Sequence, residues 1–269
     1  ILAPQPIMTS LFNKIFSLSK NIDNKRFVFN NLKNEKSTSL LFLAIEDYSE
    51  NSEIRYVGGC TRKILHREDL DDIDFAVNLK PAECIKALKK HNIKFYETGI
   101  DHGTITAVIG ENKFEITSLR KDISTDGRHA KVEFSDNWFE DASRRDFTIN
   151  SIYADIDGNL YDPFNGRSDL ELGKVLFIGN AEKRIKEDYL RILRYVRFFL
   201  NYSKLEHNDK IKKIIKQNIN GITNISSERL LAEFKKIIRS KGFFKLFQDF
   251  FCEEIIQLIF PQFKNLKIF

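Results

Sequence analysis

Two aspartates separated by one residue, Asp72 and Asp74, stand in the segment DDIDFAV. Alternate side chains of a strand share a face, so this spacing predicts that both carboxylates point one way while Ile73 and Phe75 enter a core. At about 3.3 Å per residue, their Cα atoms would lie roughly 7 Å apart, within common reach of a hard cation such as Mg²⁺. Solvated acids at a strand edge are the alternative. Asp71 falls on the opposite face.

A third acid, Glu115, occupies a second strand-like segment, KFEITSL, between Phe114 and Ile116. An acid flanked by two apolar residues in a strand points away from the core that its neighbours enter. We therefore expect Glu115 to face the same site as the aspartates.

A Gly-Gly pair lies upstream of these acids. Gly58 and Gly59 follow the strand-like IRYV and precede a predicted helix, where free N–H groups favour a phosphate. Arg62 is placed for the same anion. A tight turn alone would also explain the glycines. Phosphate donors beside paired carboxylates describe a site for a metal-bound triphosphate.

Asp188 and Arg191 lie three residues apart in a segment of helical periodicity, so we expect them to be neighbours on one helix. An ordinary helical ion pair is one interpretation. The other is a reader of bases, because a carboxylate accepts from an exocyclic amino group and arginine donates to a ring acceptor. Cytosine and adenine share that pattern, whereas uracil and guanine lack it. The apolar stripe of this helix comprises residues 189, 193, 196 and 200.

The surrounding elements change character along the chain. Residues 54–178 carry short β-branched runs with turn signals, including a hairpin signal, IDGN, at 156–159. From about residue 180 onward glycine and proline become rare and the period turns helical. We also expect helices at residues 9–20, 37–50, 81–93 and 226–240.

Composition sets wider limits. A net charge of +5 permits an anionic partner without requiring one, and the Lys-rich residues 210–218 could contact phosphates or form a solvated helix face. Three widely separated cysteines with no paired spacing favour free thiols in a reducing compartment. No apolar run reaches the length of a membrane span, and no secretory signal is recognised. We expect a cytoplasmic protein, with the mitochondrial matrix as the alternative.

Seven segments occur in an order that resembles class II tRNA nucleotidyltransferases, the CCA-adding enzymes, whose relatives include bacterial poly(A) polymerases. They are VGGCTRKIL…DDIDFAV, ETGIDHGTITAVI, FEITSLRKDISTDGRHAKVEF, DASRRDFTINSIY, YDPFNGRSDL, EDYLRILRYVRF and ISSERLLAEF. The resemblance implies an α+β fold, with a polymerase-β-like nucleotidyltransferase head around a small mixed sheet and then an all-helical neck. We expect an N-terminal extension at 1–27, the head at 28–178 and the neck at 179–269, without the family's body and tail.

The resemblance also implies roles for single residues. Asp72 and Asp74 would hold two Mg²⁺ ions, and Glu115 would help to deprotonate or orient the attacking 3′-hydroxyl. The implied nucleotide-binding set is Gly58, Gly59, Arg62, Arg145, Asp146, Asp188, Arg191, Arg194 and Arg197. The implied flexible loop, needed for the switch to ATP, includes Asp126, Gly127, Arg128 and His129.

Arg145 and Asp146 would contact the nucleotide sugar and tie head to neck, a surface ion pair on a helix being the alternative. Lys63 stands where the family usually has an acid, and Thr61 replaces the usual valine. Both lie near the implied triphosphate site, so nucleotide affinity or metal balance could differ from the family's.

Three functions remain open at this point. The first is template-independent addition of CCA to the 3′ end of tRNA from CTP and ATP, with two Mg²⁺ ions and release of pyrophosphate. The second is a poly(A) polymerase, and the third is an RNA-binding remnant with little activity. The loop at 122–130 and the segment ETGIDHGTITAVI resemble the CCA-adding branch. Monomer and homodimer are both compatible with the sequence.

Overall fold

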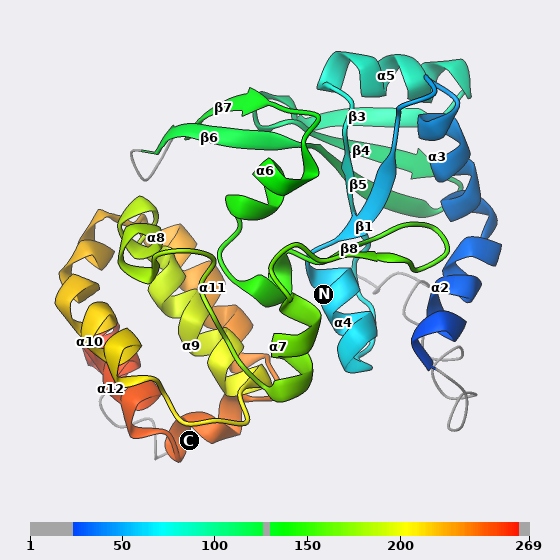
Figure 1. Cartoon of the computed structure of the whole chain (residues 1–269). Helices are drawn as coiled ribbons and strands as arrows, with labels where there is room; N and C mark the ends of the chain where they lie inside the picture. The colour runs from blue at the N-terminus through cyan, green and yellow to red at the C-terminus, as the bar shows by residue number, and fades with distance from the viewer. Residues whose placement is uncertain (1–23, 126–129, 264–269) are drawn as a thin grey trace, which may run out of the picture. The chain divides into compact units, whose positions relative to one another are not determined.

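The structure is a computed structural model that describes residues 24–125 and 130–263 (Figure 1). The internal contacts of the chain divide it into two compact units. The first runs to Asp122 and continues with Val132–Arg145 and Ile149–Arg167. The second comprises Ile123–Lys131, Asp146–Thr148 and the chain from Ser168 onward.

The first unit is built on a seven-stranded mixed sheet with the order β3-β4-β5-β2-β1-β8-β9. Only the β2–β5 pair is parallel among the pairs of this sheet, which lies within the described residues. The strands are β1 (Ile54–Val57), β2 (Asp74–Val77), β3 (Lys94–Gly99), β4 (Thr104–Ile109), β5 (Asn112–Ser118), β8 (Tyr153–Ala154) and β9 (Leu160–Tyr161). A separate pair is formed by β6 (Arg120–Thr125) and β7 (Ala130–Phe134).

Helices and aromatic rings complete the core of this unit. Tyr56 of β1 and Phe75 of β2 are fully buried, with ring centroids 5.0 Å apart, and Phe42 lies 5.2 Å from Tyr56. The alternating apolar residues of the strands supply one side of this cluster, and the helices supply the other. The helices of the unit are α2 (Asn24–Asn34), α3 (Lys36–Glu46), α4 (Gly59–His66), α5 (Pro81–Lys90) and α6 (Trp138–Ser143).

Several predicted elements are confirmed. The helix expected at 37–50 is α3, which ends at Glu46, and the helix expected at 81–93 is α5, which begins at its proline and ends at Lys90. The IDGN signal joins β8 to β9, with Gly158 in the left-handed region at a φ of +80°. The helix expected at 9–20 lies outside the described residues.

The second unit is helical. It contains α8 (Ala181–Glu187), α9 (Leu190–Tyr202), α10 (Asp209–Asn218), α11 (Ser227–Ile238) and α12 (Phe250–Ile259), and α7 (Gly166–Leu172) begins at its boundary. The predicted stripe of α9 is buried at Leu193, Val196 and Leu200, while Tyr189 precedes the helix and is half-buried. No helix of the described ranges has the length and apolar character needed to cross a membrane.

The division between the units differs from the boundary expected after residue 178. Residues 168–178 group with the helices, as do Asp146–Thr148. The Phe147 ring lies 4.7 Å from that of Phe177, and the Thr148 hydroxyl donates to Asp169 at 2.7 Å. These contacts attach the linking segment to the helical unit earlier than the change in composition indicated.

Candidate active site

Three carboxylates gather where the parallel strands β2 and β5 run side by side. Asp74, the first residue of β2, is paired in register with Glu115 of β5. Asp74 is half-buried, whereas Glu115 and Asp72 are exposed. Burial, and then the charges of Glu115 and Asp72, raise the pKa of Asp74 to about 6. The first unit therefore holds like charges close together, as the sequence predicted.

The route by which Asp72 approaches Asp74 differs from the prediction. Strand β2 begins only at Asp74, so Asp72 lies in the preceding turn and the two do not share a strand face. Lys63 forms an ion pair with Asp71 in this turn, and the same carboxylate accepts from the Asp72 backbone N–H at 3.1 Å. Burial would raise the pKa of Asp71, but Lys63 outweighs it and lowers the pKa. Asp72 therefore approaches Asp74 from the segment before β2 and not from the face of a strand.

The Gly-Gly pair joins β1 to α4, which confirms the predicted helix after it. Gly58 has a φ of +69°, a conformation that glycine adopts without strain, so the turn explains this residue by itself. A Cβ atom at Gly58 would lie 3.5 Å from Nη1 of Arg145. Arg62 is buried and its guanidinium donates to Asn150. Gly58 and Arg145 thus approach each other closely, and a role for Gly59 stays a prediction.

Arg145 belongs to a buried ionic cluster rather than to the surface ion pair weighed as an alternative. Its Nη2 lies 3.0 Å from the carboxylate of Asp141, which is 1% exposed. Arg144 Nη2 lies 2.6 Å from that carboxylate, and the Tyr153 hydroxyl donates to it at 2.6 Å. Burial would raise the pKa of Asp141, but Arg145 and Arg144 hold it well below its usual range.

Sequence reasoning missed Asp141, Asn150 and Tyr153. One signal was available for Asp141, because it precedes Arg145 by four residues at the end of α6, the spacing of helical neighbours. Asn150 and Tyr153 gave no such signal, since their contacts depend on the fold of the chain after α6.

Asp146 belongs to the other unit. Its carboxylate accepts from Arg194 of α9, with Nε at 2.6 Å and Nη2 at 2.5 Å. The division of contacts falls between Arg145 and Asp146, so these adjacent residues are held by different units. This division supports the prediction that Arg145 and Asp146 connect head and neck.

The prediction that Asp188 and Arg191 lie on one helix is wrong, although the Arg191 backbone N–H donates to the Asp188 carbonyl at 3.0 Å. Asp188 ends α8 in an extended conformation, with φ −154° and ψ 104°, and α9 begins at Leu190. Its carboxylate accepts from Arg229 of α11 at 2.8 Å and from the Leu190 backbone N–H at 3.1 Å. Arg191 instead donates to Glu187 at 2.8 Å. The apolar periodicity runs through the break between α8 and α9, so the sequence pattern did not reveal that the helix is interrupted there.

The remaining predicted residues lie in different settings. Arg197 donates to Glu233, which is 3% exposed, at 2.6 Å, so Arg194 and Arg197 both take part in ion pairs within the helical unit. The predicted loop residues Asp126, Gly127, Arg128 and His129 lie outside the described residues. The three cysteines are free and buried.

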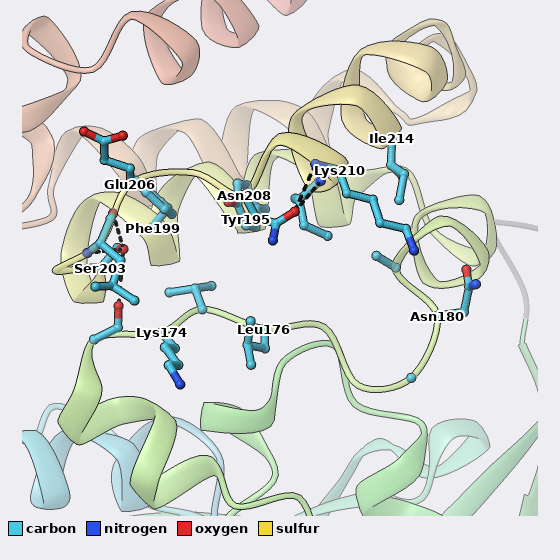
Figure 2. Close-up of a pocket in the computed structure, with 16 residues that line it drawn as sticks. Lys174, Leu176, Asn180, Tyr195, Phe199, Ser203, Glu206, Asn208, Lys210 and Ile214 are labelled. Atoms are coloured by element: carbon cyan, nitrogen blue, oxygen red, sulfur yellow. Dashed lines mark hydrogen bonds between the residues drawn. The ribbon is translucent and has the colours of Figure 1, made fainter.

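A cavity of about 530 Å³ opens within the helical unit (Figure 2). Tyr195 and Phe199 of α9, Leu176 and Lys210 are among the residues that line it. Neither Asp188 nor Arg191 does so. The cavity is therefore separate from the residues predicted to read the base.

Comparison with known proteins agrees with this architecture. Residues 54–176 match the family described as Poly A polymerase head domain, and residues 208–267 match the probable RNA and SrmB-binding site of polymerase A. The human mitochondrial CCA tRNA nucleotidyltransferase 1 is 44% identical over 216 residues, which cover 78% of this chain and 48% of the relative. The chain spans about half the length of the curated relatives it matches.

Solved structures resemble the chain as well. The Bacillus stearothermophilus CCA-adding enzyme in complex with CTP has a TM-score of 0.67 at 28% identity, covering 85% of this chain and 51% of that one. A tRNA nucleotidyltransferase complexed with a primer tRNA and an incoming ATP analog has a TM-score of 0.64 at 25% identity, covering 82% and 62%.

Fold and comparisons together define the class: a polymerase-β-like nucleotidyltransferase head followed by an all-helical region. Within that class, the chain belongs to the family of class II tRNA nucleotidyltransferases and poly(A) polymerases.

Proposed function

We propose that this protein adds CCA to the 3′ end of tRNA from CTP and ATP without a nucleic-acid template, releasing pyrophosphate. The observation that carries the proposal is the group of Asp72, Asp74 and Glu115, with the pKa of Asp74 raised to about 6. Perturbed carboxylates that repel one another are typical of sites that hold cations or move protons. Relatives named as CCA-adding enzymes support the choice of reaction.

The carboxylate group fits magnesium by the chemistry of its donors. Mg²⁺ prefers oxygen ligands and is usually held by one or two carboxylates together with substrate phosphates. The oxygens of Asp72, Asp74 and Glu115 do not all lie within 4.8 Å of one another, as expected for three like charges. We assign Asp72 and Asp74 as the ligands of two Mg²⁺ ions, which would neutralise charge on the triphosphate and the attacking oxygen.

The other residues of the first unit have supporting roles in this proposal. Gly58, Gly59 and Arg62 would contact the triphosphate, and Arg145 would approach the nucleotide sugar from its cluster around Asp141. Glu115 is exposed and next to Asp74, so it is available to orient the 3′-hydroxyl or accept its proton. In the helical unit, Arg194 and Arg197 would support the base site, while Asp146 holds Arg194.

Asp188 and Arg191 would select the base, and different partners hold each of them in place. Arg229 and the N-terminus of α9 orient the Asp188 carboxylate, and Glu187 orients Arg191. A carboxylate held in this way can accept from the amino group of cytosine or adenine and repels the carbonyl oxygen of uracil or guanine. Replacing Asp188 would therefore change the choice of nucleotide more than the chemistry of transfer.

Asp188→Asn is expected to reduce the preference for CTP over UTP by about 10- to 100-fold, since a good base contact is worth about 1–3 kcal/mol. Arg229→Gln should give a smaller loss, because it frees the carboxylate without removing it. Incorporation of each single labelled nucleotide measures the ratio. Arg239→Gln, an exposed arginine after the same helix α11, is the matched control. An unchanged ratio in Asp188→Asn would refute the assignment.

The partners follow from the reaction: tRNA, CTP and ATP. The similarity to mitochondrial relatives supports the mitochondrial matrix as the site of action, in place of the cytoplasm.

The choice of RNA substrate distinguishes a CCA-adding enzyme from a poly(A) polymerase. A poly(A) polymerase would extend an unstructured RNA primer with ATP alone, whereas a CCA-adding enzyme should act on a tRNA ending before CCA and stop after three nucleotides. Failure on both RNAs would favour an RNA-binding remnant.

A further inference from the structure

We propose that the helical unit carries a second metal site, for a transition-metal ion such as Zn²⁺, formed by His207, Asp249 and Cys252. One ligand atom from each of these residues lies within 4.8 Å of the other two. The group is separate from the carboxylates of the first unit and differs from them in chemistry, since it offers nitrogen, oxygen and sulfur.

Two of the three ligands are fixed by one helix start. Asp249 is the N-cap of α12, and its Oδ1 accepts from the Cys252 backbone N–H at 2.9 Å. This capping bond holds the Asp249 carboxylate against the backbone of the first turn, to which Cys252 belongs. His207 comes from the segment between α9 and α10, and its Nε2 lies 3.0 Å from both oxygens of Asp249 and 3.6 Å from Sγ of Cys252.

These separations suit a tetrahedral ion. With Zn–N about 2.0–2.1 Å, Zn–O about 2.0–2.2 Å and Zn–S about 2.3 Å, tetrahedral angles place neighbouring ligand atoms about 3.3–3.6 Å apart. The distance of 3.6 Å between Nε2 of His207 and Sγ of Cys252 has this value, and the 3.0 Å between Nε2 and the Asp249 oxygens is slightly shorter. An ion could be bound after shifts of a few tenths of an ångström.

The histidine ring is already oriented. Its Nδ1 lies 3.0 Å from the Tyr195 hydroxyl, and its plane stacks on Phe199 with centroids 3.5 Å apart at 13°. Metal-binding histidines usually have a partner on the second ring nitrogen, which fixes the tautomer and aims the first at the ion. Tyr195 and Phe199, whose rings contact that of His207, also line the cavity of Figure 2.

The Cys252 thiol, which hydrogen-bonds to Asp249 and lies 3.6 Å from Nε2 of His207, distinguishes this group from a histidine–carboxylate pair. The pairs His66–Glu68 and His91–Asp47 in the first unit belong to no such group of three among the described residues. Thiolate and imidazole together favour Zn²⁺ over Mg²⁺. The Asp249 side chain is 20% exposed whereas Cys252 is fully buried, which leaves the carboxylate side for a solvent ligand.

The test is a titration of the whole chain with Co²⁺ as a visible substitute for Zn²⁺, in excess Mg²⁺ to occupy hard-oxygen sites. We expect one equivalent with a sulfur-to-cobalt charge-transfer band that Zn²⁺ abolishes by displacement. Cys252→Ser should lose the band. Cys84→Ser, which changes a buried thiol of the first unit, should keep it.

A second variant guards against loss of folding. Asp249→Asn preserves the N-cap, because asparagine caps helices as well as aspartate does, but removes the charged ligand. A cooperative thermal transition in chelator should show that it is folded, while its affinity for Zn²⁺ should fall at least about 10-fold. No sulfur-to-cobalt band in the unchanged chain would overturn the proposal. So would a band that survives Cys252→Ser, or an affinity unaffected by Asp249→Asn.

Discussion

Replacing Asp74 with asparagine is expected to lower the rate of nucleotide addition by at least about 10³-fold, while the chain becomes more stable. The loss of rate follows because the amide cannot supply the charge that a metal-assisted transfer requires, and single preorganised electrostatic groups are often worth a factor of about 10²–10³ or more. Glu115 and Asp72 remain in this variant but cannot replace a ligand at the start of β2.

The gain in stability follows from the pKa of Asp74. Burial and neighbouring acids raise it from 3.8 to about 6, so the folded state holds the proton more tightly than the unfolded state. Stability therefore falls as pH rises from about 4 to 6, and the cost is fully present above pH 6. The asparagine variant avoids that cost, which is roughly 1–3 kcal/mol from a shift of about two pH units.

Both effects are measured at pH 7.5, the rate with magnesium and the melting temperature in chelator. Asp101→Asn is the matched control, since Asp101 is an exposed acid of the same unit that lies outside the group around Asp74. It should change the rate less than about 2-fold and the stability by less than about 1 kcal/mol. An active Asp74→Asn variant would show that this carboxylate is not part of the catalytic site.

Asp141→Asn is expected to destabilise the first unit by about 3–5 kcal/mol, because it removes the negative partner of a buried cluster. Arg144, Arg145 and Tyr153 all direct their polar atoms at this carboxylate, which is 1% exposed. Urea denaturation measures the loss. The nucleotide KM should also rise, since Arg145 would no longer be held beside Gly58.

The same cluster predicts a pH dependence. The pKa of Asp141 is depressed by Arg145 and Arg144 against the effect of burial, so its stabilisation is complete above its unfolded value of 3.8. It should be lost progressively as pH falls from about 4 toward the depressed pKa of the folded state, and the asparagine variant should have a flatter stability curve in that range.

Asp157→Asn is the control for Asp141, because Asp157 pairs with Lys33 at 2.5 Å but is 56% exposed. That variant should lose less than about 1 kcal/mol. Equal losses in the two variants would show that burial of the Asp141 cluster has no special weight.

The sequence predicted which acids of the head lie together, but it did not predict the backbone segments that position them. Apolar alternation located β2 and β5, but β2 begins only at Asp74, and Asp71, in the segment before it, pairs with Lys63. Lys63 was noticed only as a departure from the family pattern. Hydrophobic periodicity does not predict the residue at which a strand begins.

The helical unit shows a second limit. The stripe through Leu193 and Val196 predicted α9, yet the same period concealed the break at Asp188, whose partner Arg229 lies 41 residues away. Cys252 had no sequence spacing typical of a metal ligand, because His207 reaches it across 45 residues. Contacts between elements distant in sequence determine both the position of Asp188 and the group around Cys252. A local sequence pattern therefore predicts neither of them.

The most direct test of the account supplies a tRNA ending before CCA with magnesium, CTP and ATP, and determines the sequence of the extended 3′ end. We expect two cytidines followed by one adenosine and then no further addition, with no product from the Asp72→Ala/Asp74→Ala chain. A run of adenosines without cytidine, or no addition by a chain shown to be folded, would contradict it.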